Sequence, residues 1–314
     1  MLQLRMGTIR TNTPRHLRVV NPLPMRLTAR DIKVLQAVHD YRVLSREQIQ
    51  RLLFPSQNTT NYRLQRLYQH GFLERRWRSV EYGQGMGQAI YLSTKKGANI
   101  LTQHLTVSQE RLHHQSISRT VRSPFLEHTL RVNDVCIAFA LAVQDAGYRI
   151  ERWLRDDELR AAREYVYMTA NSGTSHQVAI IPDAYLALGL IDRRAHFLLE
   201  IDRATETSGR WAHRVQAYQA YIASGQYSRR FGTTSLRILV ITTSRERLTN
   251  LRHATEEVGG GSIFWFTTLE LAQFGAVLAE PIWQVAGQDG MIKLIKGSSR
   301  ERKTGELQDP SSNP

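Results

Sequence analysis

The sequence predicts an α+β protein with two domains, a small helical one followed by a mixed α/β one. Three observations lead to this prediction. All of the excess positive charge lies in the first two fifths of the chain. Residues 27–105 follow the order helix, helix, helix, strand, strand, helix. Residues 123–286 alternate apolar strands with helices, which is typical of a central sheet covered by helices.

The composition is that of a globular protein whose charge is unevenly distributed. The 314 residues are 41% hydrophobic and 22% charged, and the formal net charge is +14. Residues 1–122 hold 20 Lys and Arg against 6 Asp and Glu, whereas residues 123–314 hold 22 of each class. This asymmetry predicts a polyanion partner for the N-terminal part. A soluble basic surface without such a partner is the alternative.

Residues 1–26 are predicted to form a flexible basic arm. They contain five arginines and no acidic residue, and Asn21-Pro22-Leu23-Pro24 blocks regular secondary structure. Such an arm can lie along phosphates or in a minor groove. A disordered start without a role fits the same composition, and both interpretations stay open.

Residues 27–105 are predicted to form a winged helix-turn-helix domain. Thr28 and Ser45 begin helices with capping-box patterns, and a third helix starts near Ser56 and ends at Gly71. Strands at residues 72–80 and 89–93 then flank a glycine-rich tip, and a further helix begins near residue 94. Three helices followed by a hairpin are the element order of this DNA-binding motif.

The outward face of the third helix carries amides, hydroxyls and arginine, which are the groups that read base edges. The predicted DNA-binding residues are Asn58, Thr59, Tyr62, Arg63 and Arg66 on this helix, with Arg75, Arg76 and Arg78 at phosphates beside the wing. The predicted partner is double-stranded DNA, and a homodimer would suit a palindromic site. A winged helix used for protein contacts is the alternative.

The remaining chain divides into a linker, a second domain and a tail. Residues 106–122 are polar and are predicted to be a linker in which the adjacent His113 and His114 are solvated. Ser123-Pro124 begins a long helix that opens the domain at residues 123–286. Residues 287–314 have no packing pattern and are predicted to be disordered.

Carboxylates interrupt two apolar, strand-forming runs in the second domain. Glu200 and Asp202 are two residues apart, so they share one face of a strand, and Asp183 lies on the preceding run. Three acids on one face of a sheet need a positive partner. The partner could be a metal ion, or it could be an arginine such as Arg203, Arg210 or Arg214.

The pair Pro182-Asp183 and the segment Glu200-Ile201-Asp202 resemble the restriction-endonuclease-like, or PD-(D/E)xK, superfamily. That resemblance implies that Asp183 and Glu200 hold Mg²⁺ on a strand pair, with Glu127 of the first helix assisting. The superfamily places a lysine where this chain has Asp202. The departure implies either stronger metal binding or a fold that keeps the scaffold and has lost the chemistry.

Segments spread over residues 28–285 resemble the replication-relaxation family of plasmids and other mobile elements. The segments that carry the resemblance are residues 126–134, 182–184, 197–206, 217–218, 237–244, 247–251 and 281–283. The family shares the Glu-x-Asp pattern of Glu200 and Asp202. The resemblance implies a DNA-binding protein that acts in replication or its regulation.

The function expected from the sequence is DNA binding through the winged helix, with a catalytically silent nuclease-like domain. One alternative is a Mg²⁺-dependent endonuclease or nickase that uses Asp183, Glu200 and Asp202. Another is a scaffold that recruits a replication protein. With one cysteine, and with neither a signal-peptide pattern nor an apolar run long enough to span a bilayer, we expect a cytoplasmic protein without a membrane partner.

Overall fold

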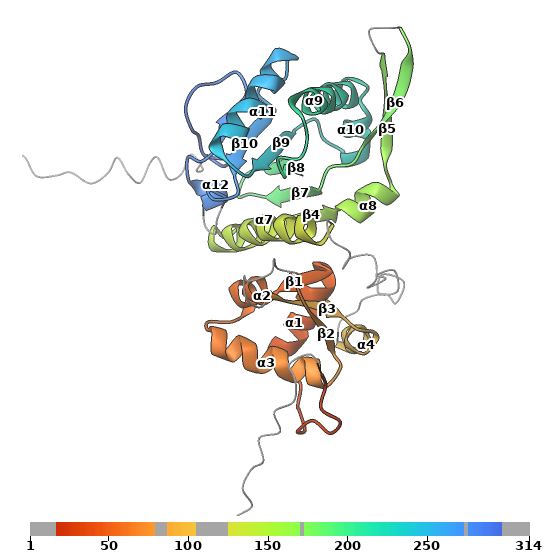
Figure 1. The fold of residues 1–314 in the computed structure, drawn as a ribbon. Coiled ribbons are helices and arrows are strands. Elements are labelled where there is room, and N and C mark those ends of the chain that lie inside the picture. The colour runs from red at the N-terminus through yellow and green to blue at the C-terminus, as the bar shows by residue number, and fades with distance from the viewer. Residues whose placement is uncertain (1–16, 79–86, 105–124, 170–172, 273–275, 297–314) are drawn as a thin grey trace, which may run out of the picture. The chain divides into compact units, whose positions relative to one another are not determined.

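The computed structural model describes residues 17–78, 87–104, 125–169, 173–272 and 276–296 (Figure 1). The chain divides into two compact units, Met1–Asn133 and Asp134–Pro314. The division falls inside helix α7 (Phe125–Asp145), so the start of this helix belongs to unit 1 and its remainder to unit 2. The predicted linker at 106–122, the wing tip and His113-His114 lie outside the described residues.

Unit 1 follows the predicted order of helices and strands. Its elements are α1 (Ala29–Asp40), β1 (Val43–Ser45), α2 (Arg46–Leu53), α3 (Gln57–Gln69), β2 (Leu73–Trp77), β3 (Ala89–Ser93) and α4 (Lys95–His104). Thr28 and Ser45 form the two capping boxes that the sequence indicates. The short strand β1 was not predicted. It pairs antiparallel with β3 and completes a sheet of order β1-β3-β2.

The core of unit 1 is closed by the first turns of α7. Leu126 and Leu130 pack with Val43, Ile90 and Leu92 in one buried cluster. Two polar side chains fix the same contact, because the Asn133 amide donates to the Val43 carbonyl at 2.7 Å and the Gln48 amide donates to the Leu130 carbonyl at 2.8 Å. Buried polar groups that are bonded in this way specify one arrangement of the elements.

The arm is ordered where the structure describes it. Residues 17–26 were predicted to be flexible, yet residues 17–24 lie against the C-terminal half of α3. The Arg18 guanidinium donates to the Tyr68 carbonyl at 2.9 Å and to the Glu74 carboxylate at 2.8 Å. Hydrogen bonds to residues distant in sequence hold this segment in place, although its own sequence predicts no regular structure. Residues 1–16 lie outside the described part.

Unit 2 contains a six-stranded mixed sheet and a separate hairpin. Its elements are β4 (Arg149–Arg155), α8 (Asp156–Ala161), β5 (Glu164–Thr169), β6 (Ser175–Ile180), β7 (Ala184–Gly189), β8 (Arg194–Ile201), α9 (Ser208–Ala223), α10 (Gln226–Phe231), β9 (Arg237–Thr242), α11 (Arg245–Glu257), β10 (Phe264–Thr268), α12 (Ala276–Ala279) and β11 (Gln284–Val285). The sheet order is β11-β10-β9-β8-β7-β4, and β5 pairs with β6.

The sheet of unit 2 is mixed, as predicted for an α/β layer with a central sheet. Strands β4, β7 and β8 form an antiparallel meander, and β9 then pairs parallel to β8 after the crossover helix α9. Helices α9 and α11 cover one face of the sheet, and α7 lies on the other (Figure 1). On the α7 side, Phe139 packs on Phe197 with ring centroids 6.3 Å apart.

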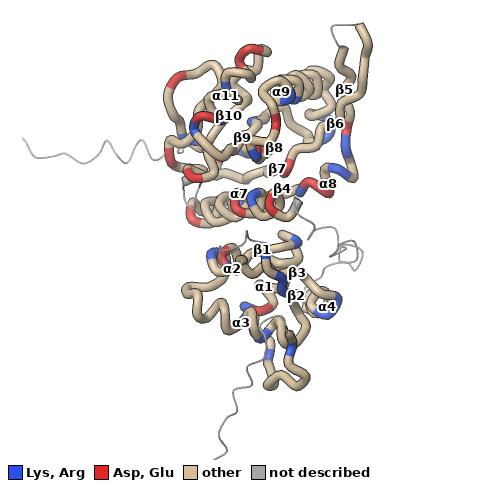
Figure 2. Tube along the Cα trace, in the orientation of Figure 1, with Lys and Arg blue, Asp and Glu red and all other residues tan. Residues whose placement is uncertain are grey.

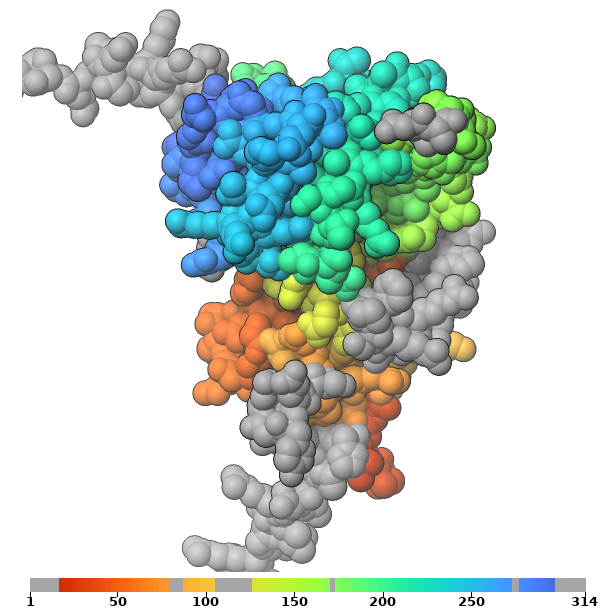
Figure 3. All heavy atoms as spheres, turned by 45° about the horizontal axis from the view of Figure 1, so that its top comes forward, coloured from red at the N-terminus to blue at the C-terminus, as the bar shows by residue number. Residues whose placement is uncertain are grey.

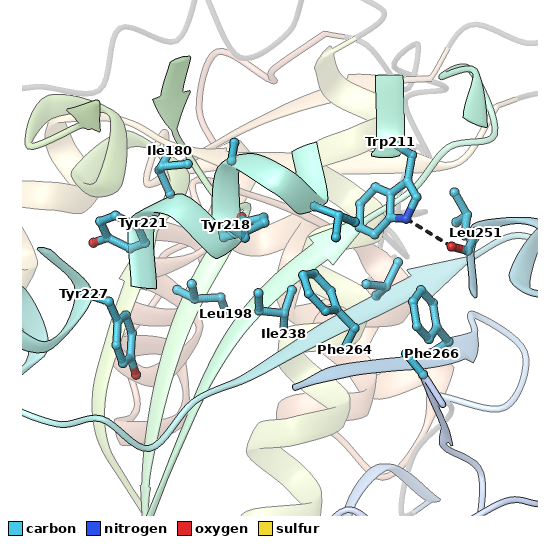
Figure 4. Close-up of a cluster of buried hydrophobic side chains, with 14 of the residues drawn as sticks. Ile180, Leu198, Trp211, Tyr218, Tyr221, Tyr227, Ile238, Leu251, Phe264 and Phe266 are labelled. Carbon is cyan, nitrogen blue, oxygen red and sulfur yellow. Dashed lines mark hydrogen bonds between the residues drawn. The ribbon is translucent and has the colours of Figure 1, made fainter. Parts of the chain in front are cut away.

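The face under α9 and α11 holds the main core of unit 2. Tyr218 and Tyr221 of α9 lie over Leu198 and Ile238 of the sheet (Figure 4). The Trp211 indole is 1% exposed and donates to the Leu251 carbonyl of α11 at 3.2 Å. Each of these side chains withdraws a large apolar surface from water, which is the main stabilising term in such a layer.

In unit 2, Pro182 separates β6, which pairs with β5, from β7, which pairs with β4 and β8. The prediction that the tail begins at residue 287 was wrong. Ile292 and Trp283 exchange backbone hydrogen bonds, and Leu294 is buried, so residues 287–296 are part of the fold. Residues 297–314 lie outside the described part.

Within the described residues, none of the helices combines the length and the apolar character that crossing a membrane requires. The long helix α7 carries the most apolar run, and it is buried in the protein core through residues such as Val135, Cys136 and Phe139. The burial of Cys136 agrees with the packing role that its place in this run indicates.

Candidate functional site

The first two turns of α3 form the exposed part of the predicted DNA-reading face. Ser56 caps the helix directly after Pro55, because its hydroxyl accepts from the Thr59 backbone amide at 3.4 Å. Asn58 and Thr59 are exposed, and Tyr62 is 57% exposed. Amide, hydroxyl and phenol groups therefore face solvent on this half of the helix.

Arg63 does not belong to that exposed face. Its guanidinium forms a two-pronged ion pair with Asp31, in which Nε lies 3.0 Å from Oδ1 and Nη2 contacts Oδ2. Asp31 also completes the capping box of α1 with Thr28, and its side chain is only 1% exposed. The structure therefore gives Arg63 a role in tying α3 to α1, which the helical periodicity alone did not reveal.

The Arg66 guanidinium binds backbone carbonyl groups of the arm. Its Nη2 donates to the Leu23 carbonyl at 3.2 Å and also contacts the Pro24 carbonyl. One turn further along, the Gln69 side chain accepts from the Val19 backbone amide at 2.7 Å. The C-terminal half of α3 therefore holds the arm, and only the N-terminal half presents unobstructed side chains.

The arginines at the start of the predicted wing have different surroundings. Arg75 lies over the Tyr68 ring at 4.2 Å from the centroid and donates to the Gln65 side chain at 2.5 Å. Arg76, which alternates to the other side of β2, is exposed. Within the described residues, the Arg76 side chain has no hydrogen bond, ion pair or ring contact of the kind that Arg75 makes.

Arg78 and Glu127 form an ion pair with each other. Arg78 Nε lies 2.9 Å from Glu127 Oε1, and its Nη2 contacts Oε2. The Gln88 side chain accepts a further hydrogen bond from Arg78 at 3.0 Å. The sequence assigned Arg78 to DNA and Glu127 to a metal site, whereas the structure pairs the two groups within unit 1. Figure 2 shows, in blue, the Lys and Arg positions on α4 and along β2.

In unit 2, Asp183 ends the ladder between β7 and β8. Its backbone amide donates to the Leu199 carbonyl at 2.9 Å. Its carboxylate Oδ2 then accepts from the Ile201 amide at 2.7 Å, in place of a backbone carbonyl. Asp183 is close enough to Glu200 for its charge to raise the pKa of that residue. The two acids that the sequence placed on neighbouring strands therefore do lie together.

Glu200 is a buried carboxyl with two partners on α9. Arg214 Nη1 donates to Oε2 at 2.7 Å, and the Tyr218 hydroxyl donates to Oε1. Burial raises the pKa of Glu200 to about 7 from an ordinary value of 4.5, and the nearby Asp183 adds to that rise. Arg214 and Tyr218 favour the charged carboxylate and therefore act against this rise in the pKa of Glu200. Arg214 was one of the partners considered from the sequence.

Asp202 is paired with an arginine that the sequence did not indicate. Arg247 of α11 donates to both carboxylate oxygens, at 2.9 and 3.0 Å, and the Thr242 hydroxyl donates at 2.6 Å. Burial disfavours the charged form, but the hydrogen bonds from Arg247 and Thr242 outweigh it and lower the pKa of Asp202. Arg247 lies 45 residues away in sequence, so no local pattern links it to Asp202.

Glu206 joins the two ion pairs into one network. Its carboxylate accepts from Arg214 at 3.1 Å, and its backbone carbonyl accepts from Arg247 at 2.7 Å. The connecting loop turns through Ala204, which adopts a left-handed φ of 59°, and the Ala204 backbone amide hydrogen-bonds to Asp202. A hydrogen-bonded loop of this kind supports a strained backbone position. We call Asp183, Glu200, Asp202 and Glu206, with Arg214 and Arg247, the acidic corner.

The acidic corner does not fit a divalent cation as it stands. Carboxylate oxygens suit Mg²⁺ chemically. However, each predicted ligand already accepts hydrogen bonds, and two of them are bound to arginines. In the described parts of the chain, no three His, Cys, Asp or Glu side chains are grouped so that they could hold a metal ion. A cation here would have to displace Arg247 and Arg214.

Two solved structures are similar to the chain at 10% sequence identity. They are restriction endonuclease FokI and the same endonuclease bound to DNA, with TM-scores of 0.28 and 0.26. The matches cover 77% and 79% of this chain, but the chain spans only 42% and 45% of those proteins. Similarity at this level supports no conclusion about function. Among curated proteins there is no match.

The model of the Replication-relaxation family matches residues 35–236, which is more than half of the 314 residues. The matched region runs from inside α1 to the start of β9 and includes α3, Asp183, Glu200, Asp202 and Glu206. The chain therefore belongs to the Replication-relaxation family.

Proposed function

We propose that this protein binds double-stranded DNA sequence-specifically through the N-terminal half of α3, and that it acts in the replication of a plasmid or other mobile element or in its regulation. The observation that carries the proposal is the exposed group formed by Asn58, Thr59 and Tyr62. The family supports the role in replication. Unit 2 then serves as a nuclease-like scaffold without catalysis.

The chemistry of α3 supports base reading at its N-terminal half. The helix has no Asp or Glu along its whole length, so no carboxylate repels the phosphates. Helix-turn-helix proteins contact base edges with the N-terminal residues of the recognition helix. That half is the one the arm leaves exposed here. Amide and hydroxyl groups at Asn58 and Thr59 match donor and acceptor patterns in the major groove.

The surrounding cations suit contacts to the DNA backbone. Arg76 on β2 is exposed, as are Lys95 and Lys96 at the start of α4. Such groups position a protein on the duplex without reading sequence. Arg63 and Arg78 are excluded from this group because each is bound to a carboxylate within unit 1.

The test begins with selection of bound duplexes from a random pool, which yields a site and its symmetry. Binding of Tyr62→Ala, Asn58→Ala and Arg76→Ala is then measured on that site and on single-base variants of it. We expect the two α3 variants to relax preference at particular bases. We expect Arg76→Ala to weaken binding to all sequences alike. It should also reduce the slope of log affinity against log salt by about 1.

Two outcomes would contradict the proposal. If the α3 variants and Arg76→Ala weaken every sequence equally, α3 is not the reader. If no sequence is enriched and binding is insensitive to salt, duplex DNA is not the ligand. A matched control is Asn250→Ala, which removes an exposed asparagine of the same kind as Asn58 from α11 of unit 2.

We propose that unit 2 is catalytically inactive because arginines pair with the carboxylates of the acidic corner. Wild type and Asp183→Ala are incubated with supercoiled DNA and Mg²⁺ or Mn²⁺, and nicked product is measured. We expect no nicking above background in either protein. Nicking by the wild type that is lost in Asp183→Ala would establish the endonuclease alternative instead.

A further inference from the structure

The hairpin of β5 and β6 is attached to unit 2 by one of its two faces. Because side chains alternate in a strand, the cross-strand pairs alternate between the faces. On the inner face, Val166 and Ile180 are buried in the core cluster with α9. Glu164, also on this face, accepts from the Tyr221 hydroxyl and from Arg230 at 3.1 Å. The inner face therefore anchors the hairpin.

The same anchoring extends toward the tip of the hairpin. His176 pairs across the strands with Met168 on the inner face. Its Nε2 lies 3.2 Å from Nε2 of His213 on α9, and the two rings are inclined by only 11°. On the outer face, none of the described residues of β5 and β6 has a hydrogen bond, ion pair or ring contact to α9.

The outer face exposes two tyrosine rings in a row. Tyr165 is 40% exposed and Tyr167 is 71% exposed. In the described part of the chain, the other tyrosine exposed to this degree is Tyr62 on α3. Burying an aromatic ring is strongly favourable, so two adjacent exposed rings indicate a surface that meets a partner. Figure 3 shows the hairpin, coloured green, at the margin of unit 2 next to α9.

The rest of the outer face is polar and lacks negative charge. Its other described residues are Thr169, Ser175, Gln177 and Ala179, and none of its described positions is Asp or Glu. The Gln177 amide donates to the Tyr167 hydroxyl at 2.7 Å and holds that ring in position. The Arg163 guanidinium lies 5.9 Å from the centroid of the Tyr165 ring.

This surface matches nucleic acid better than a protein. The fully buried core of a protein interface is more apolar than the rest of the surface, whereas no aliphatic side chain larger than that of Ala179 accompanies the two rings. Aromatic rings next to arginine are the groups on which unpaired bases stack. A face without carboxylates does not repel phosphates.

The spacing of the rings selects an unpaired strand. Tyr165 and Tyr167 are two residues apart on one face, so their Cα atoms are separated by about 6.8 Å along the strand. Bases in a duplex rise by about 3.4 Å per step. Neighbouring stacked bases therefore cannot occupy both rings, but an extended single strand can splay its bases to that distance.

We propose that the outer face of the β5–β6 hairpin binds single-stranded DNA by stacking consecutive bases on Tyr165 and Tyr167, with Arg163 at the adjoining phosphate. This site is separate from the duplex-reading face of α3 and does not depend on it. A protein with both sites would hold a duplex at one place and an unpaired strand at the other.

The test measures the affinity of the full-length protein for a fluorescent oligothymidine and for a fluorescent duplex. The double variant Tyr165→Ala/Tyr167→Ala is expected to lose single-strand affinity by at least about tenfold. The matched control, Tyr165→Phe/Tyr167→Phe, keeps the rings and is expected to bind within about threefold of wild type. Duplex affinity should be the same in all three proteins.

Two further measurements separate this site from α3 and from general charge attraction. Tyr62→Ala is expected to lose duplex specificity and keep single-strand binding. With one or two arginines at phosphates, the log–log salt slope for the single strand should be only about −1. Thermal unfolding of the Ala and Phe double variants checks that both are folded.

Three outcomes would overturn the proposal. One is a folded Ala double variant that binds oligothymidine as tightly as wild type does. Another is an equal loss of affinity in the Phe variant, since stacking does not need the hydroxyl groups. The third is an Ala variant with unchanged single-strand affinity but a lower mass in solution, which would assign this face to self-association.

Discussion

Arg63 and Arg66 are neighbours on one helix, yet neither is available in the way that helical periodicity indicates. Arg63 turns to Asp31 of α1, and Arg66 turns to the carbonyl groups of Leu23 and Pro24. A side chain as long as arginine reaches partners well beyond its own helical face. At the scale of single residues, the contacts of Arg63 and Arg66 are therefore decided by segments distant in sequence.

The pair between Asp202 and Arg247 provides a test of this point. Asp202→Ala leaves the Arg247 side chain, which is only 14% exposed, without its carboxylate. We expect the free energy of unfolding to fall by about 3 kcal/mol. The control is Asp192→Ala, which removes a pair between side chains that are each about half exposed and should cost less than about 1 kcal/mol. Urea denaturation measures both, and equal losses would contradict the structural role of the pair.

Glu200 predicts a pH dependence of stability. Its folded pKa of about 7 is above the ordinary value of 4.5, so the folded protein holds an extra proton between these values. The contribution of Glu200 to the free energy of unfolding is at most about 3 kcal/mol. It is fully present below about pH 4.5 and is lost as the pH rises through about 7. Glu200→Gln should lack this component. If denaturation at several pH values shows the same decline in both proteins, the carboxyl is not protonated as described.

At the scale of elements, α3 is divided into two halves with different partners. The first half presents Asn58, Thr59 and Tyr62 to solvent, and the second half holds the arm through Arg66 and Gln69. Proline and asparagine at residues 21–24 predict the absence of regular structure, and that prediction is confirmed for the described part. Irregular backbone has unpaired carbonyls, and those of Leu17, Leu23 and Pro24 accept hydrogen bonds from α3.

Docking of the arm can be tested by amide hydrogen exchange. Arg66→Ala removes two hydrogen bonds to the arm, so we expect exchange in residues 17–26 to accelerate by about tenfold or more. The control is Arg76→Ala, whose exposed side chain lies on β2. Unchanged exchange in Arg66→Ala would mean that Arg18 and Gln69 hold the arm without it.

At the scale of the whole molecule, the net charge of +14 overstates the charge that can meet DNA. Residues 123–314 are neutral in sum, and several arginines of unit 1 are bound to carboxylates or to the arm. Charge counted along a chain sets the long-range attraction to a polyanion. The number of close phosphate contacts depends on which cations the fold leaves exposed.

The salt dependence of duplex binding measures that number. With phosphate contacts from the exposed Arg76, Lys95 and Lys96, the slope of log affinity against log salt should be about −3. If every one of the 14 excess charges met a phosphate, the slope would be about −13. Titrations of the selected duplex over a range of salt concentrations distinguish the two, and a slope near zero would contradict DNA binding through these cations.

The sequence by itself determined the features that depend on local chemistry. Capping residues, helical and strand periodicity and the glycine at residue 71 predict most helices and strands of both units, and the apolar strands predict the central sheet. The proximity of Asp183 and Glu200 also follows from the pairing of two neighbouring strands. In each of these cases the interacting residues are close in the chain, or the regular geometry of a strand pair brings them together.

Only the tertiary structure decided which charged groups are engaged with each other. It pairs Asp202 with Arg247, Glu127 with Arg78 and Asp31 with Arg63, and these residues are 45, 49 and 32 positions apart. Buried and half-buried charges require a partner of opposite sign. Many arginines in the chain could serve, and packing selects one of them. For that reason a sequence that suggests a metal site folds into an acidic corner closed by arginines.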